Sequence, residues 1–323
     1  MKSLPIAFII SLILLNPFDT LANTKISTSG TTCDCNIKVN LTDTDVQFKK
    51  QVLFRAGKGK DNVIQGIALD ISHSYLYSLN VTGRPEKGVI NRFIYSSTGN
   101  LISDAVQTPS DIIGHQGLSI IPADGGILAS AGESIANKGW HIVKLTFAPG
   151  STPLNVHFIK IFEPEFKGNI STMPTITPDG DKVIIRGVIG KKNILRIYQG
   201  KAINYDLADW SHGHFTQWQI SPELTKDKYV LQAMTTDGKN IFLLSGGGND
   251  LPKRLFTYDF DGKLIAINNS VTLGKNEASL SGIERHWEPE GMAYDSKTNN
   301  LLMVFAIGDH GTRKALMFRI PLQ

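Results

Sequence analysis

The sequence is poor in the features that mark many disulfide-stabilised, membrane and nucleic-acid-binding proteins. It has two cysteines in 323 residues, Cys33 and Cys35, and their separation by one residue leaves them unable to join distant parts of a fold. After the N-terminal segment, no stretch approaches the roughly 18 consecutive apolar residues of a membrane-spanning helix. The net charge is only +4 and the basic residues are scattered, which argues against nucleic-acid binding.

Catalytic and cofactor-binding motifs are also missing from the sequence. It contains no Gly-x-Ser-x-Gly elbow, no His-Glu-x-x-His motif, no P-loop and no dinucleotide-binding glycine fingerprint. No stretch shows the 3.6-residue periodicity of an amphipathic helix. We therefore expect a protein that holds no metal and no cofactor. The cysteine pair leaves open a strained local disulfide, an intermolecular bridge or two free thiols.

The N-terminus has the pattern of a secretory signal peptide. Lys2 precedes an apolar run from Leu4 to Leu15, and Thr20 and Ala22 supply the small residues of a cleavage site. We expect a signal peptide over residues 1–22, a tail with the Cys-Asp-Cys run over residues 23–44, and one domain over residues 45–323. The expected mature protein is secreted or periplasmic, monomeric and without a membrane span.

A hexapeptide pattern recurs five times along the chain. Its copies begin 51, 58, 58 and 58 residues apart and cover Gln65–Asp70, Gln116–Ile121, Pro174–Asp179, Gln232–Asp237 and Glu290–Asp295. Periods slightly below this length are typical of the blades of β-propellers. The third copy differs, because Pro174-Thr175 stands where Gln-Gly is expected.

Apolar and alternating runs after each copy predict further strands. Second strands are expected over Tyr75–Leu79, Ile127–Ala131, Val183–Val188, Ile241–Leu244 and Leu301–Ile307. Third strands are expected over Arg92–Tyr95, His141–Phe147, Ile194–Tyr198, Leu255–Phe260 and Ala315–Ile320. Fourth strands are expected in the first four repeats only, over Leu101–Ser103, Val156–Phe162, Ala202–Asp206 and Leu264–Asn268.

These repeats predict an all-β, five-bladed β-propeller closed by an N-terminal strand. The fifth repeat has no room for a fourth strand before the sequence stops at Gln323, and Val46–Phe54 is a strand-like segment without a partner of its own. If Val46–Phe54 paired with the fifth repeat, the first and last repeats would be joined by hydrogen bonds. A linear stack of sheets is the alternative, and it would leave its terminal sheets uncapped.

In a propeller, the loops that lead into the innermost strands share one face with the loops between second and third strands, and we call this the loop face. Amides, histidines and aromatic residues fall there by position, a combination that suits the hydroxyls and apolar faces of sugars. The predicted ligand-binding residues are Gln65, His115, Gln116, Trp210, His212, His214, Gln232, His286, Trp287, Glu290, His310 and Arg313.

Each of these residues also has a structural interpretation. The ring of Gln65, Gln116, Gln232 and Glu290 could bind hydroxyls or a hard cation, or it could satisfy backbone groups near the channel. Trp210 and Trp287 could pack beneath a loop. The charged loop residues could be solvated.

The motifs Ile64–Asp70, His115–Leu118, Glu288–Asp295 and Val304–Lys314 resemble one family. It is the TagC/helveticin J-like group of five-bladed propellers, which also occurs in a staphylococcal phage receptor-binding protein. The resemblance covers about Val46 to Gln323. It implies association with cell-envelope glycopolymers such as teichoic acids, and some members are bacteriocins.

The sequence therefore favours an exported, non-catalytic carbohydrate-binding propeller that recognises a cell-envelope or extracellular polysaccharide on its loop face. A polysaccharide lyase or hydrolase built on His115, His286 and Glu290 is a second hypothesis, and it requires these residues to lie within reach of one proton. A secreted, bacteriocin-like antibacterial protein is a third.

Overall fold

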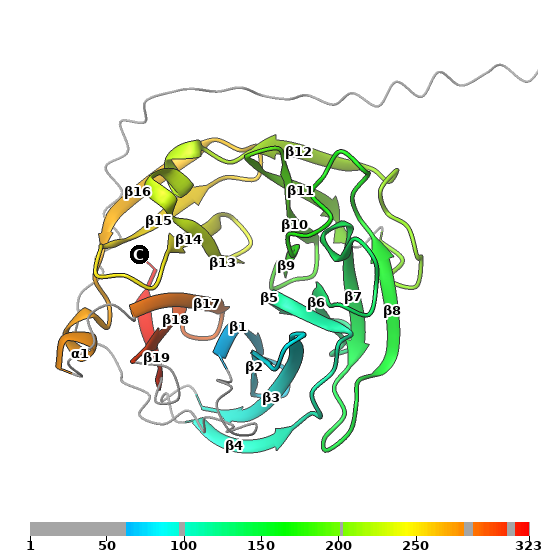
Figure 1. Cartoon of the computed structure of the whole chain (residues 1–323), viewed down its shortest axis with the longest axis horizontal. Coiled ribbons are helices and arrows are strands. Elements are labelled where there is room, and N and C mark those ends of the chain that lie inside the picture. The colour runs from blue at the N-terminus through cyan, green and yellow to red at the C-terminus, as the bar shows by residue number, and fades with distance from the viewer. Residues whose placement is uncertain (1–62, 97–100, 201–202, 281–286, 309–313, 323) are drawn as a thin grey trace, which may run out of the picture.

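The computed structural model describes residues 63–96, 101–200, 203–280, 287–308 and 314–322. Within these residues the chain forms five antiparallel sheets arranged in a ring (Figure 1). Each sheet follows the chain from the ring's centre to its rim, so the sheets are the five blades of a β-propeller. The predicted five-bladed architecture is confirmed, whereas closure by Val46–Phe54 concerns a segment outside the described residues.

The strands of the first two blades are β1 (Val63–Asp70), β2 (Tyr75–Thr82), β3 (Lys87–Tyr95), β4 (Leu101–Val106), β5 (Ile113–Ile120), β6 (Ile127–Ala131), β7 (His141–Thr146) and β8 (Leu154–Lys160). Those of the third and fourth blades are β9 (Met173–Ile176), β10 (Lys182–Ile189), β11 (Lys192–Gln199), β12 (Phe215–Gln219), β13 (Val230–Thr236), β14 (Ile241–Gly246), β15 (Lys253–Tyr258) and β16 (Leu264–Val271). The described part of blade five has β17 (Trp287–Asp295), β18 (Asn300–Ile307) and β19 (Lys314–Pro321).

The fourth strand of blade three differs from the prediction over Ala202–Asp206. Residues 203–206 form no strand, and the outer strand is β12, which pairs with β11 from Tyr198–Phe215 to Ile194–Gln219. The prediction was wrong because a short apolar run after a glycine predicts a strand at 202–206, whereas Phe215–Gln219 (FTQWQ) does not alternate between apolar and polar residues and so gives little strand signal. The segment before β12 is therefore the connection between β11 and β12.

The fold is mostly β rather than entirely β. A six-residue helix, α1 (Lys275–Leu280), precedes β17, and 3-10 turns occur at Lys138–Trp140 and Pro222–Lys228. These elements are too short to give a helical periodicity in the sequence. No helix among the described residues is both long and apolar enough to span a membrane.

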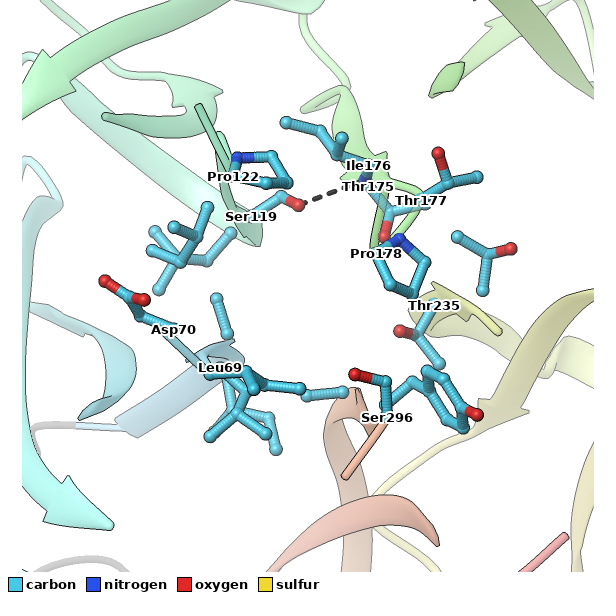
Figure 2. A pocket seen from close by; sticks show the side chains of 18 of the residues that line it. Leu69, Asp70, Ser119, Pro122, Thr175, Ile176, Thr177, Pro178, Thr235 and Ser296 are labelled. Carbon is cyan, nitrogen blue, oxygen red and sulfur yellow. Dashed lines mark hydrogen bonds between the residues drawn. The ribbon is translucent and has the colours of Figure 1, made fainter. Parts of the chain in front are cut away.

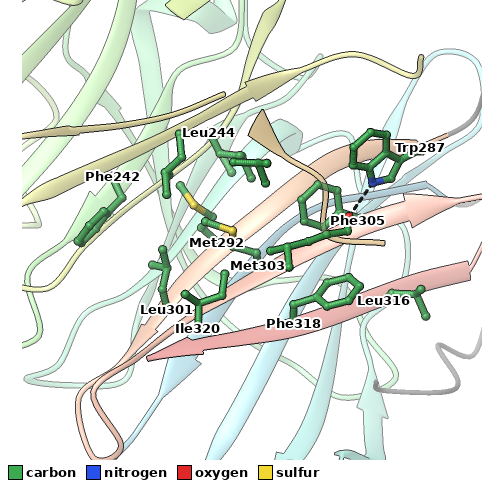
Figure 3. Packing of buried hydrophobic residues seen from close by; sticks show 14 of the residues in the cluster. Phe242, Leu244, Trp287, Met292, Leu301, Met303, Phe305, Leu316, Phe318 and Ile320 are labelled. Carbon is green, nitrogen blue, oxygen red and sulfur yellow. Dashed lines mark hydrogen bonds between the residues drawn. The ribbon is translucent and has the colours of Figure 1, made fainter. Parts of the chain in front are cut away.

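Each seam between neighbouring blades has its own cluster of buried apolar side chains. The cluster between blades four and five packs Phe242 and Leu244 of β14 against Met292, Met303 and residues farther out in blade five (Figure 3). The middle strands are almost continuously apolar because both of their faces meet a neighbouring blade.

Blade five packs directly against blade one, which closes the ring among the described residues. Ile67 and Phe93 of blade one share a cluster with Val304 and Met317 of blade five. A buried polar contact crosses the same seam: the Tyr95 hydroxyl donates to Asp295 Oδ2 at 2.8 Å.

Arg319 completes this polar contact. Its Nη2 donates to the Tyr95 hydroxyl at 3.0 Å and to the backbone oxygen of Ser96 at 2.9 Å. Burial and the adjacent Asp295 carboxylate raise the pKa of the Tyr95 phenol well above its usual value. The phenol therefore stays protonated and remains a donor to Asp295 across the physiological pH range.

Replacing Tyr95 with Phe is expected to weaken the seam between blades one and five. The change leaves Asp295 and Arg319 buried without their shared partner, and the expected loss is about 1 to 3 kcal/mol of unfolding free energy. Urea unfolding followed by tryptophan fluorescence measures it. Tyr294→Phe is the matched control, since the Tyr294 hydroxyl donates to Asn299 Oδ1 within blade five and not across a seam. An equal loss in both variants would contradict the expectation.

Candidate functional site

The first position of the hexapeptide repeat lies at a β-bulge in four of the five innermost strands. The pairing register shifts around Gln65 in β1, Gln232 in β13 and Glu290 in β17, and it shifts between Ile113 and Leu118 in β5, which contains Gln116. A bulge inserts one residue into a strand and redirects its side chain. The four polar side chains therefore gather at one level of the channel, and we call them the amide ring.

Blade three does not contribute to the amide ring. Pro174 pairs with Ile185 in a regular register and β9 is only four residues long. Gln116 and Gly117 in blade two have φ values of +69° and +87°, and Gly117 lies against Met173 and Pro174. The third repeat, which differs from the others in sequence, therefore leaves a gap in the amide ring.

The amide ring is connected across the axis by hydrogen bonds. Gln116 Nε2 donates to Gln232 Oε1, although blades two and four are not neighbours. Gln232 Nε2 donates in turn to Glu288 Oε1 at 2.8 Å. All four ring residues are at most 8% exposed, and the space beside them measures about 10 Å³. That volume holds about one water molecule, so the ring narrows the channel and leaves no room for a sugar.

The opposite end of the innermost strands opens into a cavity of about 310 Å³, which we call the channel mouth (Figure 2). All five blades line it, through the last residues of the innermost strands and the turns that follow them. Its hydroxyl groups belong to Ser72, Ser119, Thr175, Thr177, Thr235, Thr236, Tyr294 and Ser296, and its apolar surface includes Leu69, Ile176, Pro122 and Pro178.

The hydroxyls of the channel mouth differ in how far they are already engaged. Ser119 Oγ accepts from the Ile176 amide at 3.1 Å, and Thr177 Oγ1 accepts from the Lys182 amide at 2.9 Å. The side-chain hydroxyls of Thr235 and Ser296 make no hydrogen bond to the described residues (Figure 2). These last two hydroxyls are available to a ligand.

Two charged side chains stand at the rim of the channel mouth. Lys297 Nζ donates to the backbone oxygen of Ile71 at 2.9 Å. Burial raises the pKa of Asp70, but hydrogen bonds from Ser72 and His73 outweigh it and leave the pKa lowered. Asp70 is therefore an ionised acceptor that is already engaged within its own turn.

The aromatic segment at 210–214 does not lie at the channel. Trp210 is 5% exposed and packs against Tyr198 and Tyr205. Its amide donates to the backbone oxygen of Lys160 at the end of β8, the outer strand of blade two. His212 and His214 are exposed beside it, with His212 Nε2 3.4 Å from a Glu163 carboxylate oxygen. The predicted position before an innermost strand was wrong, because the fourth strand of blade three had been misplaced.

Trp287 packs inside the protein and is not accessible to a ligand. Its side chain is fully buried in the seam between blades four and five (Figure 3), and its Nε1 donates to the Leu273 backbone oxygen at 2.8 Å. The Lys253 ammonium lies 4.2 Å from the centre of the indole ring. Lys253 Nζ also donates to the backbone oxygens of Gly247 and Asn249.

Of the four remaining predicted residues, the structure describes only His115. His115 lies on the loop face, with its Nδ1 3.1 Å from a Glu86 carboxylate oxygen. His286, His310 and Arg313 lie outside the described residues. Among the residues that the structure does describe, no group of three or more His, Cys, Asp or Glu side chains is placed to hold a metal ion.

The sequence reasoning missed the channel mouth, although the repeat carried a signal for it. The fourth position of the hexapeptide is always small, with Ala68, Ser119, Thr177, Thr235 and Ala293. Small side chains near the end of an innermost strand leave space at the axis. Of the six repeat positions, only the polar first one contributes residues to the predicted ligand-binding set.

Comparison with known proteins identifies the family of this chain. Residues 63–318 match the phage five-bladed β-propeller receptor-binding platform domain. The chain belongs to this family. The phage part of the resemblance inferred from the motifs is thereby confirmed, and its TagC and helveticin J part stays a prediction. No match was found among the curated proteins.

Two solved structures share the fold. The tail fiber of Staphylococcus aureus phage P68 is similar with a TM-score of 0.54 and 17% identity, over 81% of this chain and 50% of that one. The chain thus spans about half the length of that tail fiber. A GH43 β-1,3-galactosidase bound to galactodeoxynojirimycin is similar with a TM-score of 0.50 and 10% identity, over 80% of this chain and 90% of that one. At these identities the similarity shows the fold alone.

Substituting Gly117 tests the bulge that supports the amide ring. A Cβ atom there would lie 2.8 Å from Met173 Cα and Pro174 Cδ, whereas one at Gly150 would meet nothing within 4 Å. Both glycines have positive φ, so both Ala variants carry left-handed strain. Gly117→Ala should lose about 1 to 3 kcal/mol more than Gly150→Ala in urea unfolding, because it adds crowding. Equal losses would contradict the tight packing at this bulge.

The free energy of unfolding should depend on pH through the titration of Lys253. Burial outweighs the attraction of Glu288 and Asp250 and lowers the pKa of Lys253 to about 7. In the unfolded chain this pKa is about 10.4, so between these values the unfolded state binds more protons and stability rises with pH. Urea unfolding at pH 7 and pH 9.5 should show a larger gain for the wild type than for Lys253→Met. The same gain in both proteins would contradict the prediction.

Proposed function

We propose that this protein is an exported, non-catalytic carbohydrate-binding propeller that recognises a cell-envelope or extracellular polysaccharide. Its family is defined by receptor-binding platforms, so a surface receptor is the expected class of partner. The proposal narrows that class to a glycopolymer such as a teichoic acid. The signal-like residues 1–22 support export.

The observation that carries the proposal is the chemistry of the channel mouth. A sugar offers a rim of hydroxyls and patches of apolar C–H groups, and the mouth offers hydroxyls from several blades beside proline, leucine and isoleucine side chains. Its volume of about 310 Å³ falls at the lower end of the range for ligand pockets. It therefore suits one end or branch of a polysaccharide.

The two available hydroxyls can orient a bound sugar by hydrogen bonding. Thr235 on β13 and Ser296 after β17 come from neighbouring blades, and both can donate and accept hydrogen bonds. Lys297 at the rim can add a charge-assisted contact to a phosphate or uronate group of the polymer. The mouth thus combines neutral sugar recognition with one basic side chain.

The loop face stays a second location for the ligand. His115 and Glu86 form a polar pair there, and His286, His310 and Arg313 belong to it by sequence position. Cleavage of the polysaccharide would support the lyase or hydrolase hypothesis, and killing of bacterial strains would support the bacteriocin-like one. No contact among the described residues favours either over binding alone.

Binding is tested with the purified protein on an array of bacterial polysaccharides and teichoic acids, followed by titration of the best hit. Thr235→Val should weaken affinity about fivefold, since one hydrogen bond is worth roughly 1 kcal/mol. Thr216→Val on the outer strand β12 is the matched control, because Thr216 is exposed and far from the channel mouth, and it should bind as the wild type does.

Three outcomes would change the proposal. Binding to no polysaccharide would overturn it. Loss of affinity in His115→Ala, with Thr235→Val unaffected, would move the site to the loop face. Shortening of the polymer chains, measured by size-exclusion chromatography, would make the protein an enzyme.

A further inference from the structure

Among the described residues three arginine side chains are buried, and one of them lacks a partner for its charge. The Arg196 guanidinium lies 4.1 Å from the centre of the Phe215 ring. The Arg319 guanidinium lies 5.2 Å from the centre of the Tyr95 ring and donates to its hydroxyl. Arg186 of β10 is 6% exposed, yet within the described part of the chain no carboxylate forms an ion pair with it and no aromatic ring lies over it.

Two neutral oxygen atoms hold the Arg186 guanidinium in place. Its Nε donates to Asn193 Oδ1 at 2.8 Å, and its Nη1 donates to the Ser171 backbone oxygen at 3.1 Å. Nη2 has no acceptor among the residues that the structure describes, and it is not sealed from solvent. Since a guanidinium has five N–H groups, three of them remain for an acceptor from outside the fold.

The Arg186 guanidinium is charged at neutral pH. Burial lowers the pKa of Arg186 to about 10, and no charged side chain among the described residues shifts that pKa in either direction. A buried charge is costly unless an opposite charge is paired with it. A water molecule would satisfy the donors but not the charge, so the missing partner is an anion.

Arg186 lies where the innermost strand of blade three ends. It is the last residue of β10 to pair with β9, which has four residues, whereas the innermost strands of the other blades have seven to nine. Met173 and Leu195 flank Arg186 on β9 and β11, and both belong to the cluster between blades three and four. The guanidinium therefore lies in this seam, on the loop-face side of the cluster, beside the half-buried Ser171 and Asn193.

The surface at this end of blade three is basic. Lys191 and Lys192 are exposed on the turn between β10 and β11, and Lys167 is exposed beside β10, where its amide donates to the Val188 oxygen. These three lysines form no ion pair with the described residues, and Glu165 is an exposed carboxylate near them. An excess of positive charge attracts anions to this part of the loop face.

We propose that Arg186 binds an oxyanion at the loop-face end of the seam between blades three and four. The bound group is a phosphate or a carboxylate, because both match the forked donors of a guanidinium. Phosphate groups and uronates of an anionic polymer are the two sources of this chemistry. The site is separate from the channel mouth and does not depend on the sugar binding proposed there.

The test is calorimetric titration of sodium phosphate and, in parallel, of sodium acetate into the full-length protein at constant ionic strength. We expect one anion per chain and a melting temperature that rises with the anion concentration, as for any ligand that binds only the folded state. Tighter binding of phosphate would support a phosphate ligand, and tighter binding of acetate would support a carboxylate. A flat titration with both anions would overturn the proposal.

Variants locate the anion. Arg186→Met should abolish the response to both anions, and without an anion it should melt no lower than the wild type, because an apolar side chain replaces an unpaired buried charge. Lys239→Met is the matched control, since it removes an exposed positive charge from the turn after β13 at the channel mouth. The control should bind both anions as the wild type does.

Three results would contradict the assignment to Arg186. Wild-type anion affinity in folded Arg186→Met would overturn it, and so would an equal loss of affinity in Lys239→Met, which would indicate unspecific attraction. If Arg186→Met failed to fold, Arg186→Lys would decide: it keeps the charge without the fork and should bind phosphate at least fivefold more weakly, so unchanged affinity would overturn the assignment. Polysaccharide binding is measured separately, and its failure would leave the anion result standing.

Discussion

The contact between the first and last blades is the constraint on which the rest of this structure depends. Tyr95 and Asp295 are 200 positions apart, yet they share a buried hydrogen bond, and a cluster of apolar side chains surrounds them. Bringing such distant segments together costs loop-closure entropy before any contact is made. That cost is offset because closure buries the outer faces of both terminal blades.

The axial channel exists only because the ring is closed. β1 approaches β5 and β17 closely, and β5 approaches β9. Gly66, Gly117 and Gly291 lie at these approaches, and a Cβ atom at Gly117 or Gly291 would crowd the neighbouring strand. Bulges next to these glycines direct the amide ring inward, while small residues farther along leave the channel mouth open. One repeat therefore builds a narrow polar end and a wide hydroxylated end.

The strand pattern was largely predictable because alternation and apolar runs are local properties. The five middle strands lie where they were expected, and Ile127–Ala131 agrees to the residue. Blade three was the exception, since the connection between β11 and β12 carries apolar residues that pack on blade two rather than forming a strand. The roles of Trp210 and Trp287 could not be predicted from the sequence, because a tryptophan can pack in a buried seam or stack on a sugar.

The sequence by itself determined the number of blades, the phage part of the family resemblance and the polar first position of four of the five repeats, since each depends on spacing and residue type along the chain. Only the tertiary structure decided which side chains meet across the axis. Gln116 and Gln232 are 116 positions apart in nonadjacent blades, and their contact follows from the radius of the closed ring and the bulges in it. The channel mouth was decided in the same way, because a cavity is the space left by five strands together.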